Sequence, residues 1–347
     1  MALIPTTILT GFLGAGKTTL LNRILQENHG FKIAVIENEF GQENIDNEIL
    51  VQDSSEQIIE MNNGCICCTV RGDLIVALTD LARRRADGLL HFDRLVIETT
   101  GLANPGPVAQ TFFMDEEVAL SYMLDAIITV VDARHAMQQL DAHQEAQRQV
   151  GFADRILLSK TDLVSAAEVA TLSTRLKRIN PRAPLGTADF GRAPIAELLD
   201  IRGFNLNEKL EIDPEFLAAE AAEEQHACAP GCDHNHHEHQ HDHHHAHHSD
   251  DIASFVFKSE RAFNTALLDE FLGGIVQVFG PRMLRYKGVL LMEGADRKVL
   301  FQGVHQLMGT DIGGKWAEHE IRGSKMVFIG QNLPKETIIK GLEQCLV

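Results

Sequence analysis

A glycine-rich segment near the start of the chain has the residue types and spacing that bind the phosphates of a nucleoside triphosphate. It reads Gly-Phe-Leu-Gly-Ala-Gly-Lys-Thr from Gly11 to Thr18, between the apolar run 6–10 and the helix-like run 19–26. Backbone N–H groups of such a loop surround the phosphates, while Lys17 reaches the β and γ oxygens and the Thr18 hydroxyl ligates Mg²⁺. The predicted nucleotide contacts here are Gly11, Gly14, Ala15, Gly16, Lys17, Thr18 and Thr19.

A second motif supplies groups that complement this loop. Glu98-Thr-Thr-Gly101 directly follows the apolar run 94–97, so we expect the carboxylate at the end of a strand. Glu98 is predicted to hold Mg²⁺ through water, and the Gly101 amide to sense the γ-phosphate. Without the glycine-rich loop, Glu98 would be an ordinary acid at a strand end. With it, Lys17, Thr18, Glu98 and Gly101 form the predicted catalytic group.

The base is indicated by a short motif after a further apolar run. Ser159-Lys160-Thr161-Asp162 follows the run 155–158. The Asp162 carboxylate can accept hydrogen bonds from both N1 and N2 of guanine, and adenine offers no such pair of donors. Lys160 can cover the base. The motif favours GTP, but Ser159 stands where asparagine is usual, which leaves one base contact open.

Three cysteines within four residues have the spacing of metal ligands. Cys65, Cys67 and Cys68 can direct two or three sulfurs at one ion. Thiolates are soft ligands that suit the tetrahedral coordination of Zn²⁺. One coordination position is left, and the acidic segment Glu37 to Glu39 is a candidate source for it. Buried structural cysteines or a redox thiol pair are the alternatives.

A histidine-rich tract offers a second kind of metal ligand. Eleven of the 17 histidines lie between His226 and His248, and Cys228 and Cys232 lie at the front of this tract. Neutral imidazoles bind divalent ions loosely, and this binding should weaken as the pH falls below about 6.5. We interpret the tract as a metal-collecting segment. A solvated linker that binds metal incidentally is the alternative.

Composition excludes several classes of function. A net charge of −18 argues against nucleic acid and against anionic membranes as partners. The chain starts without a basic leader, and no run of about 20 apolar residues is present. Five of the six cysteines lie in two clusters, and Cys345 stands alone. In a reducing compartment such clusters indicate metal ligands more than disulfides. We therefore expect a cytoplasmic protein.

The elements that position these motifs follow an α/β pattern. Short apolar runs alternate with helix-like segments, which predicts a mostly parallel sheet flanked by helices, the P-loop NTPase fold. The expected strands beyond the first are 33–36, 94–97, 126–131 and 155–158, and the clearest helices are 74–84 and 166–179.

Length and composition predict two domains joined by a linker. We expect a GTPase domain over 1–213, a disordered histidine-rich linker over 214–251 and a small α+β domain over 252–347. The expected elements of the last domain are strands 252–257, 283–292, 298–307 and 325–329, with helices at 265–278 and from Pro334 onward.

Taken together, the motifs resemble those of the CobW-like family of P-loop GTPases, and most of all its YjiA-type branch. The resemblance covers nearly the whole chain, and it includes the segments 37–41 and 64–68. It implies a metal-binding GTPase that acts as a metallochaperone or insertase, with a smaller C-terminal domain. The metal ligands that it implies are Cys65, Cys67 and Cys68, with Glu37 as the acidic partner.

We therefore predict a chaperone that binds GTP, Mg²⁺ and Zn²⁺ and delivers zinc to a client metalloprotein. No catalytic base or arginine finger is assigned, so turnover should be slow until a client or a second copy of the chain completes the site. Cobalt or nickel delivery, a cobalamin-related insertase, a histidine-rich metal store and a small-molecule kinase are the alternatives. Lys160 and Asp162 argue against the kinase.

Overall fold

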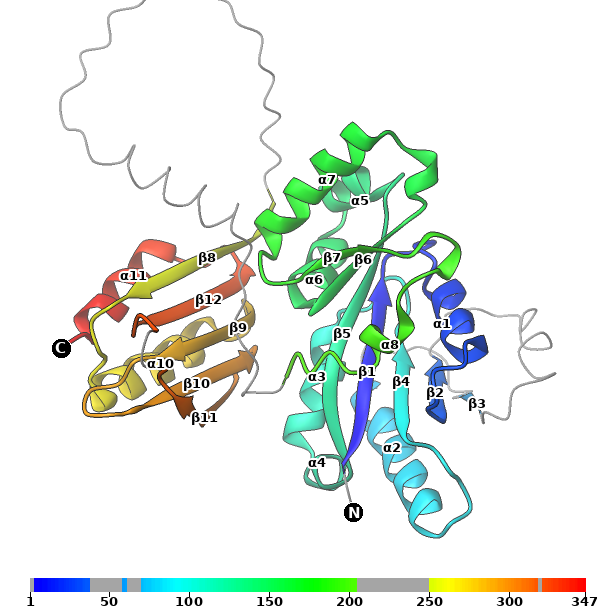
Figure 1. The fold of residues 1–347 in the computed structure, drawn as a ribbon, viewed down its shortest axis with the longest axis horizontal. Coiled ribbons are helices and arrows are strands. Elements are labelled where there is room, and N and C mark those ends of the chain that lie inside the picture. The colour runs from blue at the N-terminus through cyan, green and yellow to red at the C-terminus, as the bar shows by residue number, and fades with distance from the viewer. Residues whose placement is uncertain (1–2, 38–57, 61–69, 205–249, 318–319) are drawn as a thin grey trace, which may run out of the picture.

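Two sheets, each with its own helices, make up the structure (Figure 1). The computed structural model describes residues 3–37, 58–60, 70–204, 250–317 and 320–347. The predicted linker lies outside these residues except for Asp250 and Asp251, so the predicted domain limits stay predictions. No helix in the described ranges combines the length and the apolar character needed to cross a bilayer.

The first sheet confirms the α/β prediction. In the described part of the chain it has seven strands in the order β3-β2-β4-β1-β5-β6-β7, and every pair is parallel. β5 begins four residues before the predicted run, and the short β3 and β7 were not predicted. The strands are β1 (Ile4–Gly11), β2 (Ile33–Glu37), β3 (Ile58–Glu60), β4 (Arg94–Glu98), β5 (Tyr122–Asp132), β6 (Arg155–Ser159) and β7 (Leu185–Thr187).

Helices cover both faces of this sheet, because alternate residues of each buried strand are apolar on opposite faces. Ile8 and Ile97 face one layer, whereas Leu9 and Val96 face the other. One layer holds α1 (Lys17–Gln26) and α8 (Ile195–Leu198). The other layer holds α2 (Val70–Ala86), α3 (Pro105–Met114), α4 (Glu116–Ser121), α5 (Ala136–Ala142), α6 (Gln144–Phe152) and α7 (Ala166–Ile179).

Local signals explain where two of these helices begin. Ser165 and Glu168 form a capping box at the start of α7, as each side chain accepts from the other residue's backbone N–H. Asn104 accepts from the backbone N–H of Gly106 at the start of α3, and Pro105 occupies the first helical position. α7 matches its predicted range 166–179.

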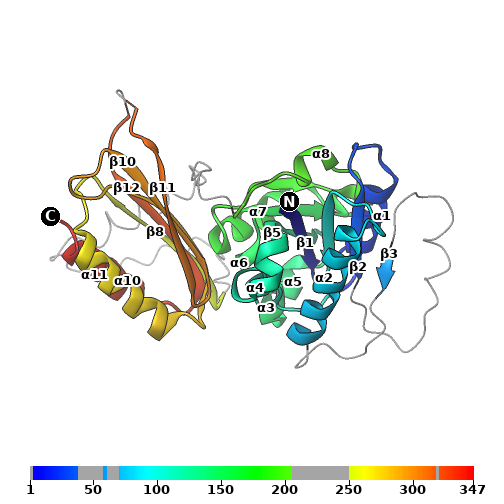
Figure 2. The ribbon, with the colours of Figure 1, turned by 90° about the horizontal axis from the view of Figure 1, so that it is seen from below.

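The second sheet is antiparallel, with order β11-β10-β9-β12-β8. It carries two helices on the face turned away from the first sheet (Figure 2). The predicted strand 298–307 divides at a turn around His305, and the exposed edge strand β11 was not predicted. Its elements are β8 (Ile252–Ser259), α10 (Thr265–Phe279), β9 (Met283–Leu290), β10 (Arg297–Val304), β11 (Leu307–Lys315), β12 (Ser324–Gln331) and α11 (Lys335–Gln344).

The other face of the second sheet packs on the first domain. Val256, Leu284 and Ile329 are buried in the same core as α6. A charged cluster lies in this interface: Asp154 accepts from Arg182 at 2.8 Å and from Arg285 at 3.2 Å, and both Asp154 and Arg285 have no exposed side-chain surface. Burial lowers the pKa of Arg285 to about 10 in spite of the carboxylate beside it.

Replacing Asp154 with asparagine is expected to reduce the free energy of unfolding by about 3–5 kcal/mol, because two buried guanidinium groups lose their counter-charge. Urea unfolding followed by circular dichroism measures this. Asp296→Asn is the matched control, since its pair with Lys315 is largely exposed and should matter little. Equal effects of the two substitutions would contradict the role given to the buried cluster.

Candidate functional site

The glycine-rich segment forms a turn between β1 and α1 that requires its glycines. Gly14 and Gly16 have φ values of 71° and 95°, in the region that glycine adopts without strain. Gly11 has φ 147°, and a Cβ there would lie 2.2 Å from the carbonyl oxygen of Val130 on β5. These positions leave the backbone amides at the start of α1 available to phosphate oxygens.

The side chains predicted to act on phosphate and Mg²⁺ gather at the start of α1. Lys17 is buried, and its ammonium group donates to the carbonyl oxygen of Phe12 at 3.5 Å. The Thr18 hydroxyl donates to Oε1 of Glu98 at 2.9 Å, so an oxygen-bearing side chain from β4 meets one from α1. Hard oxygen donors are what Mg²⁺ prefers, and this pair fits it. Thr19 follows on the exposed side of the helix.

Gly101 lies directly against the phosphate loop. A Cβ at this position would come within 2.7 Å of the backbone nitrogen and Cα of Leu13. Thr99, the first residue after β4, fixes this close approach. It donates from its backbone N–H to the carbonyl oxygen of Leu9 at 2.9 Å and from its hydroxyl to the Thr10 hydroxyl at 2.8 Å. Any larger side chain at Gly101 would push this turn away from the loop.

The predicted base-binding motif is tied to the phosphate loop by two side chains. The Ser159 hydroxyl donates to the carbonyl oxygen of Ala15 at 2.6 Å. Lys160, with φ 58°, donates to Gly14 at 2.8 Å and to the Asp132 carboxylate at 2.7 Å. Serine thus makes a loop contact from the position where asparagine is usual.

Asp132 and Asp189 support this motif, and the sequence analysis missed both. Burial by itself would raise the pKa of Asp132, but hydrogen bonds from Lys160 and His135 outweigh it and lower the pKa, which keeps the carboxylate charged. Asp189 accepts from the backbone and hydroxyl of Thr161, which orients the turn before the exposed Asp162. Asp132 ends a buried strand, as Glu98 does, and that signal could have identified it.

The predicted zinc ligands are only partly within the described residues. Glu37 ends β2, and its Cα pairs in register with Glu98 on β4. Cys65, Cys67 and Cys68 lie outside the described residues, between β3 and α2. Among the residues that are described, no three His, Cys, Asp or Glu side chains are grouped as a metal site. Glu37 is therefore placed beside the nucleotide motifs, while the thiol ligands stay predictions.

An all-parallel sheet with a glycine-rich loop, a strand-end glutamate and a Ser-Lys-x-Asp motif defines the class of P-loop GTPases. The family model for the CobW/HypB/UreG nucleotide-binding domain matches residues 5–186. The model for the C-terminal domain of the cobalamin synthesis protein cobW matches residues 252–346. This chain belongs to the CobW/HypB/UreG family, as the resemblance predicted.

Several relatives are similar over most of their length. The zinc chaperone YjiA of Escherichia coli is 42% identical over 96% of each chain, and the zinc chaperone CobW of Pseudomonas aeruginosa is 35% identical over 100% of this chain and 92% of its own. Zinc-regulated GTPase metalloprotein activator 1 of Dictyostelium discoideum is 31% identical over 99% of this chain and 80% of its own.

Solved structures of the E. coli YjiA GTPase match the whole fold. A Zn(II)-bound form superimposes with a TM-score of 0.77 at 36% identity over all of both chains. A triple mutant with one glutamate and two cysteines changed to alanine, also Zn(II)-bound, gives the same values. Both the parallel sheet and the second, antiparallel sheet therefore have counterparts in a known GTPase.

Glu98→Gln should reduce GTP turnover roughly 10- to 100-fold, because it removes the negative charge beside Thr18. It should also raise the Mg²⁺ concentration needed for half-maximal turnover. Phosphate release measured across a Mg²⁺ titration reports both effects. Glu116→Gln, an exposed change at the start of α4, is the control. Unchanged turnover in Glu98→Gln would remove this carboxylate from the site.

Asp162→Asn should weaken GTP binding on the order of 10- to 100-fold, because an amide N–H₂ would face the guanine donors that a carboxylate accepts. XTP, which presents an oxygen in place of the guanine amino group, should bind the variant better than the wild type. Competition against a fluorescent GDP measures both affinities. An unchanged ratio of GTP to XTP affinity would rule out Asp162 as the base contact.

Proposed function

We propose that this chain is a GTP-driven zinc metallochaperone. In this proposal Zn²⁺ is cargo held by Cys65, Cys67, Cys68 and Glu37, and GTP binding and hydrolysis control its transfer to a client metalloprotein. We place this activity in the cytoplasm, where thiols stay reduced. The relatives named as zinc chaperones, which match the chain from end to end, support the choice of cargo.

One observation carries the link between metal and nucleotide. Glu37 and Glu98 are register partners on neighbouring strands, and Glu98 accepts from Thr18, the residue after the phosphate-loop lysine. A carboxylate that ligates zinc from Glu37 would therefore lie one strand away from the carboxylate that meets Mg²⁺. Two divalent cations at neighbouring positions repel each other, and each also competes for the same negative charge.

The flanks of the thiol segment fit this arrangement. β3 ends at Glu60, which pairs in register with Glu37, and α2 begins at Val70. The nine residues between them, 61–69, carry all three cysteines and start from the same edge of the sheet as Glu37 and Glu98. Parallel strands present their carboxyl ends together, which is how ligands from distant parts of a sequence converge.

A consequence of this proximity is reciprocal binding. If GTP with Mg²⁺ weakens zinc binding by some factor, zinc must weaken GTP binding by the same factor. Hydrolysis then removes the γ-phosphate and restores the tighter zinc site, so the cycle of nucleotide states drives loading and release. We expect turnover to be slow without a client or second subunit, which would supply the group that completes the site.

Zinc titration against a chromogenic chelator, with a non-hydrolysable GTP analogue, GDP or no nucleotide, tests the proposal. The wild type should show one tight site whose affinity depends on the nucleotide. A Cys67→Ala, Cys68→Ala double variant should lose it, and Cys345→Ala, which changes a buried thiol of the C-terminal domain, should keep it. Glu37→Ala should weaken the site and reduce the nucleotide effect.

The histidine tract needs its own variant, because zinc can also bind outside a thiol site: the E. coli relative is still Zn(II)-bound when one glutamate and two cysteines are changed to alanine. Changing the eleven histidines between 226 and 248 to glutamine should remove weak sites and leave the tight one. If the tight site disappears with the histidines and survives the cysteine changes, the chain is a metal store instead. If the thiol site binds Co²⁺ or Ni²⁺ more tightly than Zn²⁺, the delivered metal is cobalt or nickel, and the proposed mechanism is unchanged.

A further inference from the structure

One short stretch touches both the phosphate loop and the C-terminal domain. We call residues 101–106 the coupling segment. At one end, Gly101 lies against the backbone of Leu13 in the phosphate loop. At the other end, Gly106 lies against the C-terminal domain, since a Cβ there would be 2.6 Å from Nε2 of His305. Six residues therefore span the distance between the phosphate loop and the second sheet.

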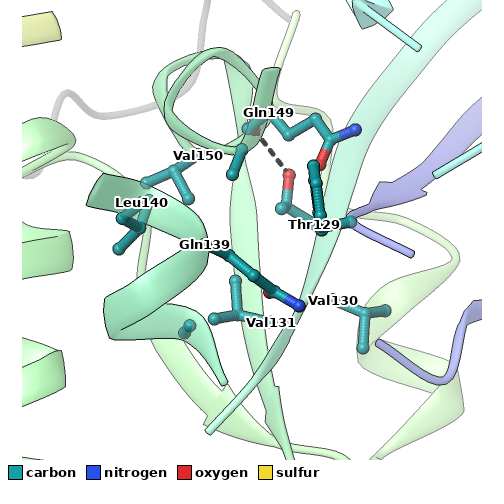
Figure 3. A pocket seen from close by; sticks show the side chains of 10 residues that line it. Thr129, Val130, Val131, Gln139, Leu140, Gln149 and Val150 are labelled. Atoms are coloured by element: carbon teal, nitrogen blue, oxygen red, sulfur yellow. Dashed lines mark hydrogen bonds between the residues drawn. The ribbon is translucent and has the colours of Figure 1, made fainter. Parts of the chain in front are cut away.

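Gln149 on α6 holds the middle of this segment. Its side-chain amide donates to the carbonyl oxygens of Gly101 at 3.1 Å and Ala103 at 3.0 Å, and the residue is 1% exposed. Its own backbone is fixed by the Thr129 hydroxyl of β5, which donates to the Gln149 carbonyl oxygen at 2.7 Å (Figure 3). Two hydrogen bonds from one buried amide therefore fix the turn at residues 101–103 to α6.

The same helix holds the start of the C-terminal domain. The Gln147 side chain accepts from the backbone N–H of Ile252 on β8 at 3.2 Å and donates to Leu140 at 2.8 Å. Gly151 lies so close to Leu284 of β9 that a Cβ there would be 2.8 Å from its side chain. α6 is therefore in direct contact with both β8 and β9.

His305 gives a second, direct connection. It sits in the turn between β10 and β11 with φ 53°, and its ring packs edge-on against Phe152 at the end of α6, 5.2 Å between centroids. Nδ1 is 3.3 Å from the carbonyl oxygen of Gly280. Burial lowers the pKa of His305, which favours the neutral ring, and Nε2 of that ring lies against Gly106.

We propose that the coupling segment transmits the nucleotide state to the C-terminal domain, with Gln149 and His305 as its positioning residues. The inference rests on the proposed role of Gly101 as the γ-phosphate sensor. Segments that follow this kind of strand rearrange when the γ-phosphate is lost. Here such a shift pulls on α6 through Gln149 and presses on the β10–β11 turn through Gly106. The C-terminal sheet therefore presents a different surface to a partner in the GTP and GDP states.

Hydrogen exchange of the full chain, with Mg²⁺ and either GMPPNP or GDP and without zinc, tests this. Wild-type protein should show different exchange in β8 and in the turn at residues 303–307 between the two nucleotides. Gln149→Leu keeps the size of the side chain and removes its donor, and the difference should be lost while both nucleotides still bind. Gln138→Leu, the same change at an exposed site on α5, should keep the difference.

His305→Asn provides an independent variant, because asparagine accepts the left-handed backbone and lacks the ring that meets Phe152 and Gly106. It should also lose the nucleotide-dependent difference, even if Gln149→Leu fails to fold. A merely structural role would change exchange equally with both nucleotides and leave their difference intact, and that result would overturn the proposal.

Nucleotide affinity measured in the same samples separates this inference from the proposed function. A wild-type chain that binds both nucleotides and shows no difference in the C-terminal domain overturns the coupling alone. A chain that binds neither nucleotide overturns the GTPase assignment and the coupling with it. Loss of zinc binding would affect the chaperone proposal and leave the exchange experiment unaltered.

Discussion

Parallel pairing of the first sheet is the constraint on which the rest of the structure depends. It brings the carboxyl ends of β1, β2, β4 and β6 to one edge, and each of these ends carries a predicted functional group. The phosphate loop, Glu37, Glu98 and Ser159 are far apart in sequence and become neighbours through register alone. A slip of one residue in any pair would turn these groups toward the opposite face.

Strong local signals made much of this arrangement predictable. The glycine-rich loop and Glu98 were identified because strand and helix periods flank them, and the observed β4 and α7 agree with the predicted runs. The fold class followed from alternation of the same kind. The contacts that hold each site residue in place could not be predicted, because a motif identifies the functional group but not the residues that contact it in the fold. Contacts such as Ser159 with Ala15 join residues 144 positions apart.

Short helices were missed for a related reason. α3 to α6 are six to ten residues long, which leaves little length in which an apolar period can be recognised, and α3 and α6 also pack against strands of the C-terminal domain. β11 is mostly exposed and has few apolar residues. Gln149 illustrates the difficulty: it reads as one more polar residue in a helix, and only the tertiary fold places its amide beside two carbonyl groups of the 101–106 turn.

The buried charges at the interface between the two sheets have a related consequence. Removing Arg285 and Asp154 from water costs free energy that their mutual attraction only partly returns, so an apolar interface could be as stable. Charged groups with fixed partners, however, allow few orientations of the two surfaces. Arg285 also donates to the carbonyl oxygen of Gly203 at 2.8 Å, which ties the end of the first domain to β9. In the proposed coupling, this fixed orientation of the two domains allows a small displacement near the phosphate loop to be transmitted through α6 to the second sheet.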